Sequence, residues 1–199
     1  TLAAKQECIE RWALAEMLQR LRTFGAFAQP GTFHDAKSLA QSCGIVPAHI
    51  KLMDRWLNLL CEAGYLDREG SGYKNRAPLP DVDAGSAWRE VETELSGDPF
   101  LLRYLGNCAK HLQGVLRGTT SPLETLFPGG SPELARNLYG NSVGPRYANL
   151  IVAAAVQAAC AAAPANRRLR ILELGAGTGA TTSAILPTLP SGLISYYFT

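Results

Sequence analysis

Apolar residues in the first half of the chain recur every three to four positions, with polar residues between them. This spacing predicts amphipathic helices over residues 2–22, 36–42, 47–63, 88–95 and 99–117. Pro47 suits the first position of the third helix, and Gly64 follows its last turn. An alanine-rich apolar run at residues 150–163 predicts a closely packed helix that is too short to span a bilayer. The chain is therefore expected to be mainly helical before its last 30 or so residues.

Two of these helices, 36–42 and 47–63, precede a short hairpin predicted around the polar turn at residues 67–72. Helix, turn, helix and hairpin in this order form the winged-helix pattern, for which a DNA-binding regulator is one interpretation. Between residues 35 and 76, however, six basic residues face five acidic ones. A DNA-binding face needs an excess of positive charge, because phosphate contacts supply much of the affinity. The pattern therefore favours a module used for packing, with the regulator as the weaker alternative.

The pattern changes near the C-terminal end of the chain. Residues 170–174 form a short apolar run that predicts a buried strand, and residues 181–189 have the spacing of a helix. Three glycines interrupt the pattern between them, at Gly175, Gly177 and Gly179. Glycine accepts a positive φ and has no Cβ to block a ligand, while the following helix offers free N–H groups. With a second strand over 193–198, the pattern predicts the first β-α-β unit of a parallel sheet.

A glycine turn of this kind suits more than one ligand. The dinucleotide fingerprint G-x-G-x-x-G/A is satisfied only loosely, with Ala180 in its last place. Glu173 stands two positions before the first glycine, where a carboxylate serves no pyrophosphate. The residues therefore argue against a nicotinamide cofactor. A glycine turn that binds nothing is the plain structural alternative.

Composition narrows the class of protein. The 199 residues are 47% apolar and 18% charged, which is typical of one large or two small globular domains. A net charge of +2 gives no reason to expect nucleic acid or a membrane as a partner. The five cysteines form no C-x-x-C pair and suggest a reduced, cytoplasmic protein. The three histidines are scattered singly, so no metal site is expected.

The string Glu173-Leu-Gly-Ala-Gly-Thr-Gly179 resembles motif I of the class I S-adenosylmethionine (SAM) methyltransferases, whose first strand closes with E/D-x-G-x-G-x-G. The resemblance implies SAM as the cofactor and places the acidic residue near its methionine end. By that resemblance the cofactor-binding residues are Glu173, Gly175, Ala176, Gly177, Thr178 and Gly179.

Three further segments resemble the methyltransferase domains embedded in polyketide synthases and hybrid peptide synthetases. They are a Leu-Phe-Pro-Gly-Gly segment at 126–130, a tyrosine before a small polar pair at 139–142, and Tyr-Tyr-Phe-Thr at 196–199. The resemblance adds Tyr139, Asn141 and Ser142 as candidate cofactor residues, for which a plain turn and helix cap is the alternative. The N-terminal part is similar to modules that precede the SAM domain of several O-methyltransferases, where they serve dimerisation and cover the active site.

The expected fold is α/β in class. It comprises a helical, winged-helix-like lid or dimerisation domain (1–117, with a linker at 77–86), connecting helices (118–165) and the start of a Rossmann-like SAM-binding sheet (166–199). Because the chain ends on a strand, we expect it to be cut from a longer polypeptide. In the family, later strands carry the adenine contacts and a catalytic His and Glu. No catalytic residue can therefore be assigned.

The resemblance implies transfer of the SAM methyl group to an acyl chain tethered to an acyl carrier protein, next to other synthase domains and with a homodimer as one option. Methylation of carbon requires prior removal of a proton by a base, whereas methylation of oxygen requires deprotonation of a hydroxyl. The sequence leaves carbon and oxygen both open. A non-catalytic methyltransferase remnant that serves as a structural module is the main alternative.

Overall fold

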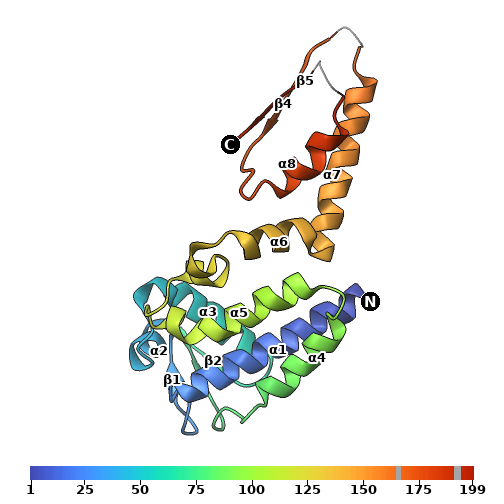
Figure 1. The fold of residues 1–199 in the computed structure, drawn as a ribbon. Helices are drawn as coiled ribbons and strands as arrows, with labels where there is room; N and C mark the ends of the chain where they lie inside the picture. Colours follow the sequence, from blue (N-terminus) through green and yellow to red (C-terminus); the bar gives the residue numbers. More distant parts are fainter. Residues whose placement is uncertain (165–166, 191–193) are drawn as a thin grey trace. The chain divides into compact units, whose positions relative to one another are not determined.

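The computed structural model describes residues 1–164, 167–190 and 194–199, and Figure 1 shows its elements. The chain forms two compact units, which are described separately. Unit 1 comprises Thr1–Gly97 with Gly106–Pro122, and unit 2 comprises Asp98–Leu105 with Leu123–Thr199. Helix α5 (Pro99–Leu116) contributes residues to both. The domain limits predicted at 117 and 165 stay predictions, and Ala165 and Asn166 lie outside the described residues.

Unit 1 is built on helices, most of which share one apolar core, while its fourth α-helix packs on its first. Its helices are α1 (Leu2–Thr23), α2 (Ala36–Ser42), the 3-10 turn η1 (Pro47–His49), α3 (Ile50–Glu62), α4 (Ala84–Glu94) and the end of α5. Trp12 of α1 packs on Trp88 of α4, with 4.9 Å between the ring centroids. The core under α1 and α3 includes the fully buried Leu21, Met53 and Leu57. The helices predicted from hydrophobic spacing are thus confirmed.

A small antiparallel sheet completes unit 1. Its strands are β1 (Phe33–His34), β2 (Asp67–Glu69) and β3 (Gly72–Lys74), in the order β1-β3-β2. The hairpin of β2 and β3 was predicted, but its turn is shorter than the predicted one, because β2 occupies residues 67–69. Strand β1 was not predicted. Phe33 lies over Gly72 so closely that a Cβ there would come within 2.4 Å of its ring. Asn75 is 1% exposed and donates from Nδ2 to the carbonyls of Phe27, Gln29 and Ala77.

Three predicted helix boundaries are wrong by several residues. The helix predicted over residues 150–163 begins earlier, as α7 (Val143–Ala162), and its Leu150, Ile151 and Val152 are exposed rather than closely packed. Helix α4 begins at Ala84, inside the predicted linker, because the Asp83 side chain caps it by accepting the Ser86 N–H at 3.0 Å. Helix α8 (Ala180–Ile185) ends before residue 189, because Pro187 has no N–H to continue it and the chain tightens into the 3-10 turn η4 (Leu186–Thr188).

Unit 2 contains a β-α-β unit beside two longer helices. Helices α6 (Glu133–Asn141) and α7 (Val143–Ala162) follow the 3-10 turns η2 (Pro122–Thr125) and η3 (Pro128–Gly130). Strands β4 (Leu169–Glu173) and β5 (Ile194–Phe198) are parallel and joined through α8, with Ile171 opposite Tyr196. Both predicted strands and their parallel pairing are confirmed for the described residues. Leu193, the predicted first residue of the second strand, lies outside them.

A buried carboxylate joins two helix N-termini of unit 2. Asp98 is 4% exposed, and its Oδ1 accepts the Leu101 N–H at 3.1 Å in the first turn of α5. Its Oδ2 accepts the Ser142 hydroxyl at 2.6 Å and the Val143 N–H at 2.8 Å, at the start of α7. Free N–H groups and a positive dipole end favour a negative charge at both places. Asp98 therefore fixes the start of α7 against the start of α5.

The two faces of the described β4–β5 pair differ. Helices α7 and α8 lie on one side of it (Figure 1), the side of Ile171, Glu173 and Tyr196. On the other side Leu172 and Tyr197 are 62% and 56% exposed.

No helix within the described part of the chain is long and apolar enough to cross a membrane.

Candidate functional site

The glycine turn lies between the carboxyl end of β4 and the first turn of α8. Gly175, Gly177 and Gly179 have φ values of 74°, 58° and 75°, which a residue with a Cβ adopts only under strain. Backbone bonds to the end of β5 hold the turn: the Ala176 N–H donates to the Thr199 carbonyl at 2.8 Å, and the Thr199 N–H to the Glu173 carbonyl at 3.2 Å. The turn is therefore shaped by both strands.

A pocket of about 850 Å³ opens over this turn, and we call it the glycine-turn pocket. It is lined by Leu126, Phe127, Pro132, Arg136, Tyr139, Pro145, Ala148, Asn149, Gly175, Ala176, Gly177, Thr178, Ala180 and Thr181. The structure thus brings Tyr139 of α6 together with most of the predicted glycine turn. The Leu-Phe-Pro-Gly-Gly segment contributes Leu126 and Phe127. Apolar walls with a few polar groups are typical of small-molecule sites.

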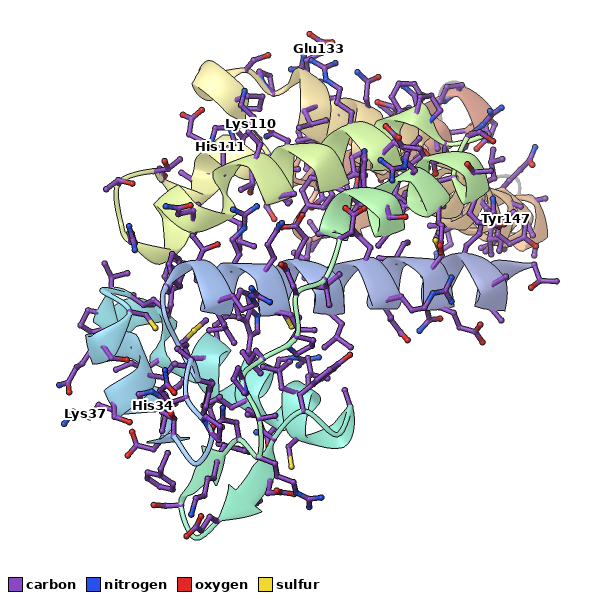
Figure 2. The ribbon with its side chains drawn as sticks, turned by 90° about the horizontal axis from the view of Figure 1, so that it is seen from below. His34, Lys37, Lys110, His111, Glu133 and Tyr147 are labelled. Atoms are coloured by element: carbon purple, nitrogen blue, oxygen red, sulfur yellow. The ribbon has the colours of Figure 1, made fainter. Side chains whose placement is uncertain are left out.

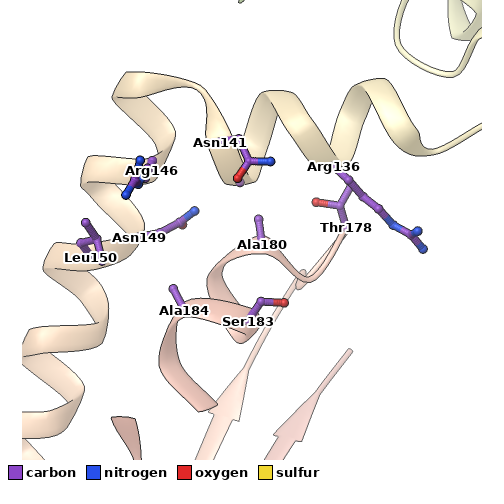
Figure 3. Close-up of a pocket in the computed structure, with 10 residues that line it drawn as sticks. Arg136, Asn141, Arg146, Asn149, Leu150, Thr178, Ala180, Ser183 and Ala184 are labelled. Atoms are coloured by element: carbon purple, nitrogen blue, oxygen red, sulfur yellow. The ribbon is translucent and has the colours of Figure 1, made fainter. Parts of the chain in front are cut away.

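A second pocket of about 580 Å³ adjoins it and shares part of its lining (Figure 3). Asn141 of α6, predicted from the resemblance, lines this second pocket. Asn149 of α7 and Thr178 of the turn line both. Asn149 also connects three helices, since its Oδ1 accepts the Thr181 hydroxyl at 2.8 Å and its Nδ2 donates to the Tyr139 carbonyl at 2.9 Å. It therefore fixes Tyr139 relative to the helix that follows the turn.

Among the described residues that line the glycine-turn pocket, Arg136 is the one with a charged side chain. It forms no ion pair with a described carboxylate, unlike Arg103, which pairs with Glu133 at 3.3 Å. No carboxylate or imidazole lines the described part of this pocket. The pocket can therefore hold an anionic group beside an apolar one, but its described lining offers no obvious proton acceptor.

Glu173 lies beneath the turn and is not part of either pocket lining. Its Oε2 accepts the Thr182 hydroxyl at 2.5 Å and the Tyr196 hydroxyl at 2.7 Å. Burial raises the pKa of Tyr196 to about 12, and the bond to the Glu173 carboxylate adds to the shift. Oε1 takes no hydrogen bond from a described residue.

Two other predicted residues also lie outside both pocket linings. Gly179 is the N-cap of α8, in the left-handed conformation. Ser142 is 2% exposed and donates its hydroxyl to Asp98. Their assignments to the cofactor stay predictions, as do those of the other candidate residues.

The sequence motifs assigned no cofactor role to Arg136, Phe127 or Asn149, although Phe127 belongs to the Leu-Phe-Pro-Gly-Gly segment. Asn149 stands as a lone amide next to the apolar stretch that begins at residue 150, and that contrast could have marked it. Arg136 gives no such signal, because an arginine on a helix usually faces solvent.

The described residues contain no group of three metal-ligating side chains. His34 of β1 and His111 of α5 are well separated in Figure 2. Burial lowers the pKa of His34.

Comparison with known proteins gives relatives that match nearly all of the chain, although no family model matches it. Pyochelin synthetase PchF of Pseudomonas aeruginosa (strain UCBPP-PA14) is 33% identical over 195 residues, which cover 94% of this chain and 10% of that protein. Polyketide synthase ThaQ of Burkholderia thailandensis is 30% identical over 191 residues, which cover 92% of this chain and 9% of that protein. The chain thus spans about a tenth of the length of these relatives.

Solved structures agree with the sequence relatives. The CurJ carbon methyltransferase has a TM-score of 0.87 at 32% identity, over 96% of this chain and 51% of that one. The DszA carbon methyltransferase has a TM-score of 0.82 at 26% identity, over 97% and 51%. The citrinin polyketide synthase CMeT domain, with a TM-score of 0.73 at 20% identity over 94% and 50%, shares the fold.

The comparisons favour neither a DNA-binding regulator nor a structural remnant, and they confirm the family predicted from the sequence motifs. In both sequence and fold, the chain matches the methyltransferase domains of polyketide synthases.

Proposed function

We propose that this chain is part of a SAM-dependent carbon methyltransferase domain of a polyketide synthase, with the glycine-turn pocket as its cofactor site. The observation that carries the proposal is the left-handed glycine turn, which ends β4 and opens into a pocket of about 850 Å³. A volume of this size is within the usual range for small-molecule sites. Carbon is preferred over oxygen because the neighbours at 32% and 26% identity are carbon methyltransferases.

The lining of the glycine-turn pocket and Glu173, which lies beneath the turn outside that lining, suit the parts of SAM. The glycines admit a ligand close to the backbone, since a Cβ added at Gly175 would meet no atom within 4 Å and would point into open space. Phe127 and Tyr139 offer apolar and aromatic surface. Arg136 offers a cation for the carboxylate, and Glu173 beneath the turn offers a carboxylate for the ammonium group. When bound, SAM supplies an electrophilic methyl group on sulfur.

The proposed acceptor is the α-carbon of a β-ketoacyl thioester carried by an acyl carrier protein. This carbon becomes nucleophilic only after a base removes its proton. The described pocket lining contains no carboxylate or imidazole. We therefore assign the base to the part of the domain that this chain does not span, since the matched solved chains are about twice as long.

Unit 1 is proposed to act as a winged-helix-like lid or dimerisation module within a cytoplasmic synthase. Two observations support this role over DNA binding. Many of its apolar side chains pack in its own core, and several of its arginines pair with neighbouring carboxylates, as Arg76 does with Asp67 and Arg22 with Asp81. The carrier protein and neighbouring synthase domains are the expected partners.

Calorimetry with S-adenosylhomocysteine on the intact domain tests the assignment. Gly177→Val should abolish binding, because a branched residue at φ 58° distorts the turn. Gly64→Val is the matched control: Gly64 has φ 80° and open space around it, but it ends α3 in unit 1. Undiminished affinity in Gly177→Val, or equal loss in both variants, would contradict the proposal.

A further inference from the structure

Glu173 is held by two hydroxyl groups from different elements. Thr182 comes from α8 and is 7% exposed, whereas Tyr196 comes from the middle of β5. Both donate to the same oxygen, Oε2, at 2.5 Å and 2.7 Å. Hydrogen bonds to a charged carboxylate are about twice as strong as neutral ones.

The sheet register explains why these three residues meet. Ile171 lies opposite Tyr196, so Glu173 and Tyr196 project from the same face of the β4–β5 pair. Helix α8 packs on that face and brings Thr182 to the same oxygen. The carboxylate is thereby fixed on one side, directly before the glycine turn.

We infer that Thr182 and Tyr196 are positioning residues: by holding Oε2 of Glu173, they keep its other oxygen, Oε1, for the ammonium group of an amino-acid ligand bound at the glycine turn. This inference rests on the proposed function and deepens it. It assigns a role to two residues outside the glycine motif, and it specifies the chemical group of the ligand on which they act.

The alternative is that the two hydroxyls only hold β5 and α8 together. A structural role would affect every ligand of the pocket, whereas a positioning role affects only ligands that carry the ammonium group. Because the pKa of Tyr196 is raised to about 12, its hydroxyl keeps its proton throughout the physiological pH range and can donate to Glu173 at every pH in that range.

The experiment compares two ligands on the intact domain by calorimetry. S-adenosylhomocysteine carries the amino-acid group, and 5′-methylthioadenosine carries the same nucleoside and thioether without it. Tyr196→Phe and Thr182→Val each remove one hydroxyl and should weaken S-adenosylhomocysteine binding about tenfold while leaving methylthioadenosine binding unchanged. In a Glu173→Gln background, adding Tyr196→Phe should cost little further affinity.

Two variants serve as controls. Tyr197→Phe removes a hydroxyl from the opposite, exposed face of the same strand, and Thr182→Ser keeps the hydroxyl; both should bind like the wild type. Equal loss for both ligands, or no loss in Tyr196→Phe, would overturn the inference while leaving the cofactor site intact. A wild-type domain that binds neither ligand would overturn the proposed function and this inference with it.

Discussion

Replacing Asp98 with alanine should destabilise the intact domain by about 3 kcal/mol. Its carboxylate caps the first turn of α5 through the Leu101 N–H and the first turn of α7 through the Val143 N–H. A lost helix cap costs about 1 kcal/mol. The Ser142 hydroxyl, which is 2% exposed, would also lose its acceptor, at a cost of about 1 kcal/mol or more.

The assay is urea denaturation of the wild type and the variant, followed by far-ultraviolet circular dichroism. Trp12, Trp56 and Trp88 are all in unit 1, so tryptophan fluorescence would miss a loss confined to unit 2. Hydrogen exchange over residues 143–149 adds a local measurement. It should accelerate in the variant, because the start of α7 then lacks its carboxylate.

Two variants separate the contributions. Ser142→Ala removes one bond but keeps the cap on Val143, so it should cost about 1 kcal/mol. Asp83→Ala removes one exposed cap from α4 and should cost about 1 kcal/mol or less. If Asp98→Ala costs no more than Asp83→Ala, the two-helix role of Asp98 is refuted.

Three further predictions concern other parts of the chain. Arg136→Gln should weaken S-adenosylhomocysteine about tenfold and spare 5′-methylthioadenosine in calorimetry, because only the former has the carboxylate; equal effects would contradict this. Asn75→Ala should lower the free energy of unfolding by about 2 kcal/mol in urea denaturation, since the buried carbonyl of Phe27 and the partly buried bonds to Gln29 and Ala77 lose their donor; a change below about 0.5 kcal/mol would count against it. The folded pKa of Tyr196 lies near 12, above the usual value of about 10, so its contribution to stability is complete below pH 10 and is lost towards pH 12. The stability of Tyr196→Phe should therefore fall less than that of the wild type over this window, and parallel pH curves would refute the assignment.

The parts of the fold that were predicted from the sequence depend on residues that are close together along the chain. The glycine turn is one example, because a strand, left-handed glycines and a helix follow within about 15 residues. The hairpin of β2 and β3 is another. The end of α8 also follows a local rule, since Pro187 stops the helix earlier than its apolar spacing predicts.

The unpredicted contacts join residues that are distant along the chain. Asp98 and Ser142 are 44 positions apart, and Thr181 and Asn149 are 32 apart. Neither pair follows a periodic pattern, because a buried polar contact depends on how whole helices pack. Ser142 illustrates the consequence: its hydroxyl is bonded to a carboxylate that no motif marks, while its assignment to the cofactor stays a prediction.

The bonds between the glycine turn and the end of β5 have a consequence for folding. The Ala176 N–H is held by the Thr199 carbonyl, so the turn reaches its final shape only after β5 has paired with β4. During synthesis the glycine segment leaves the ribosome before that strand does, and it samples many conformations until the strand arrives. A competent cofactor site is therefore expected late in folding, and a peptide that carries the glycine motif alone should not reproduce it.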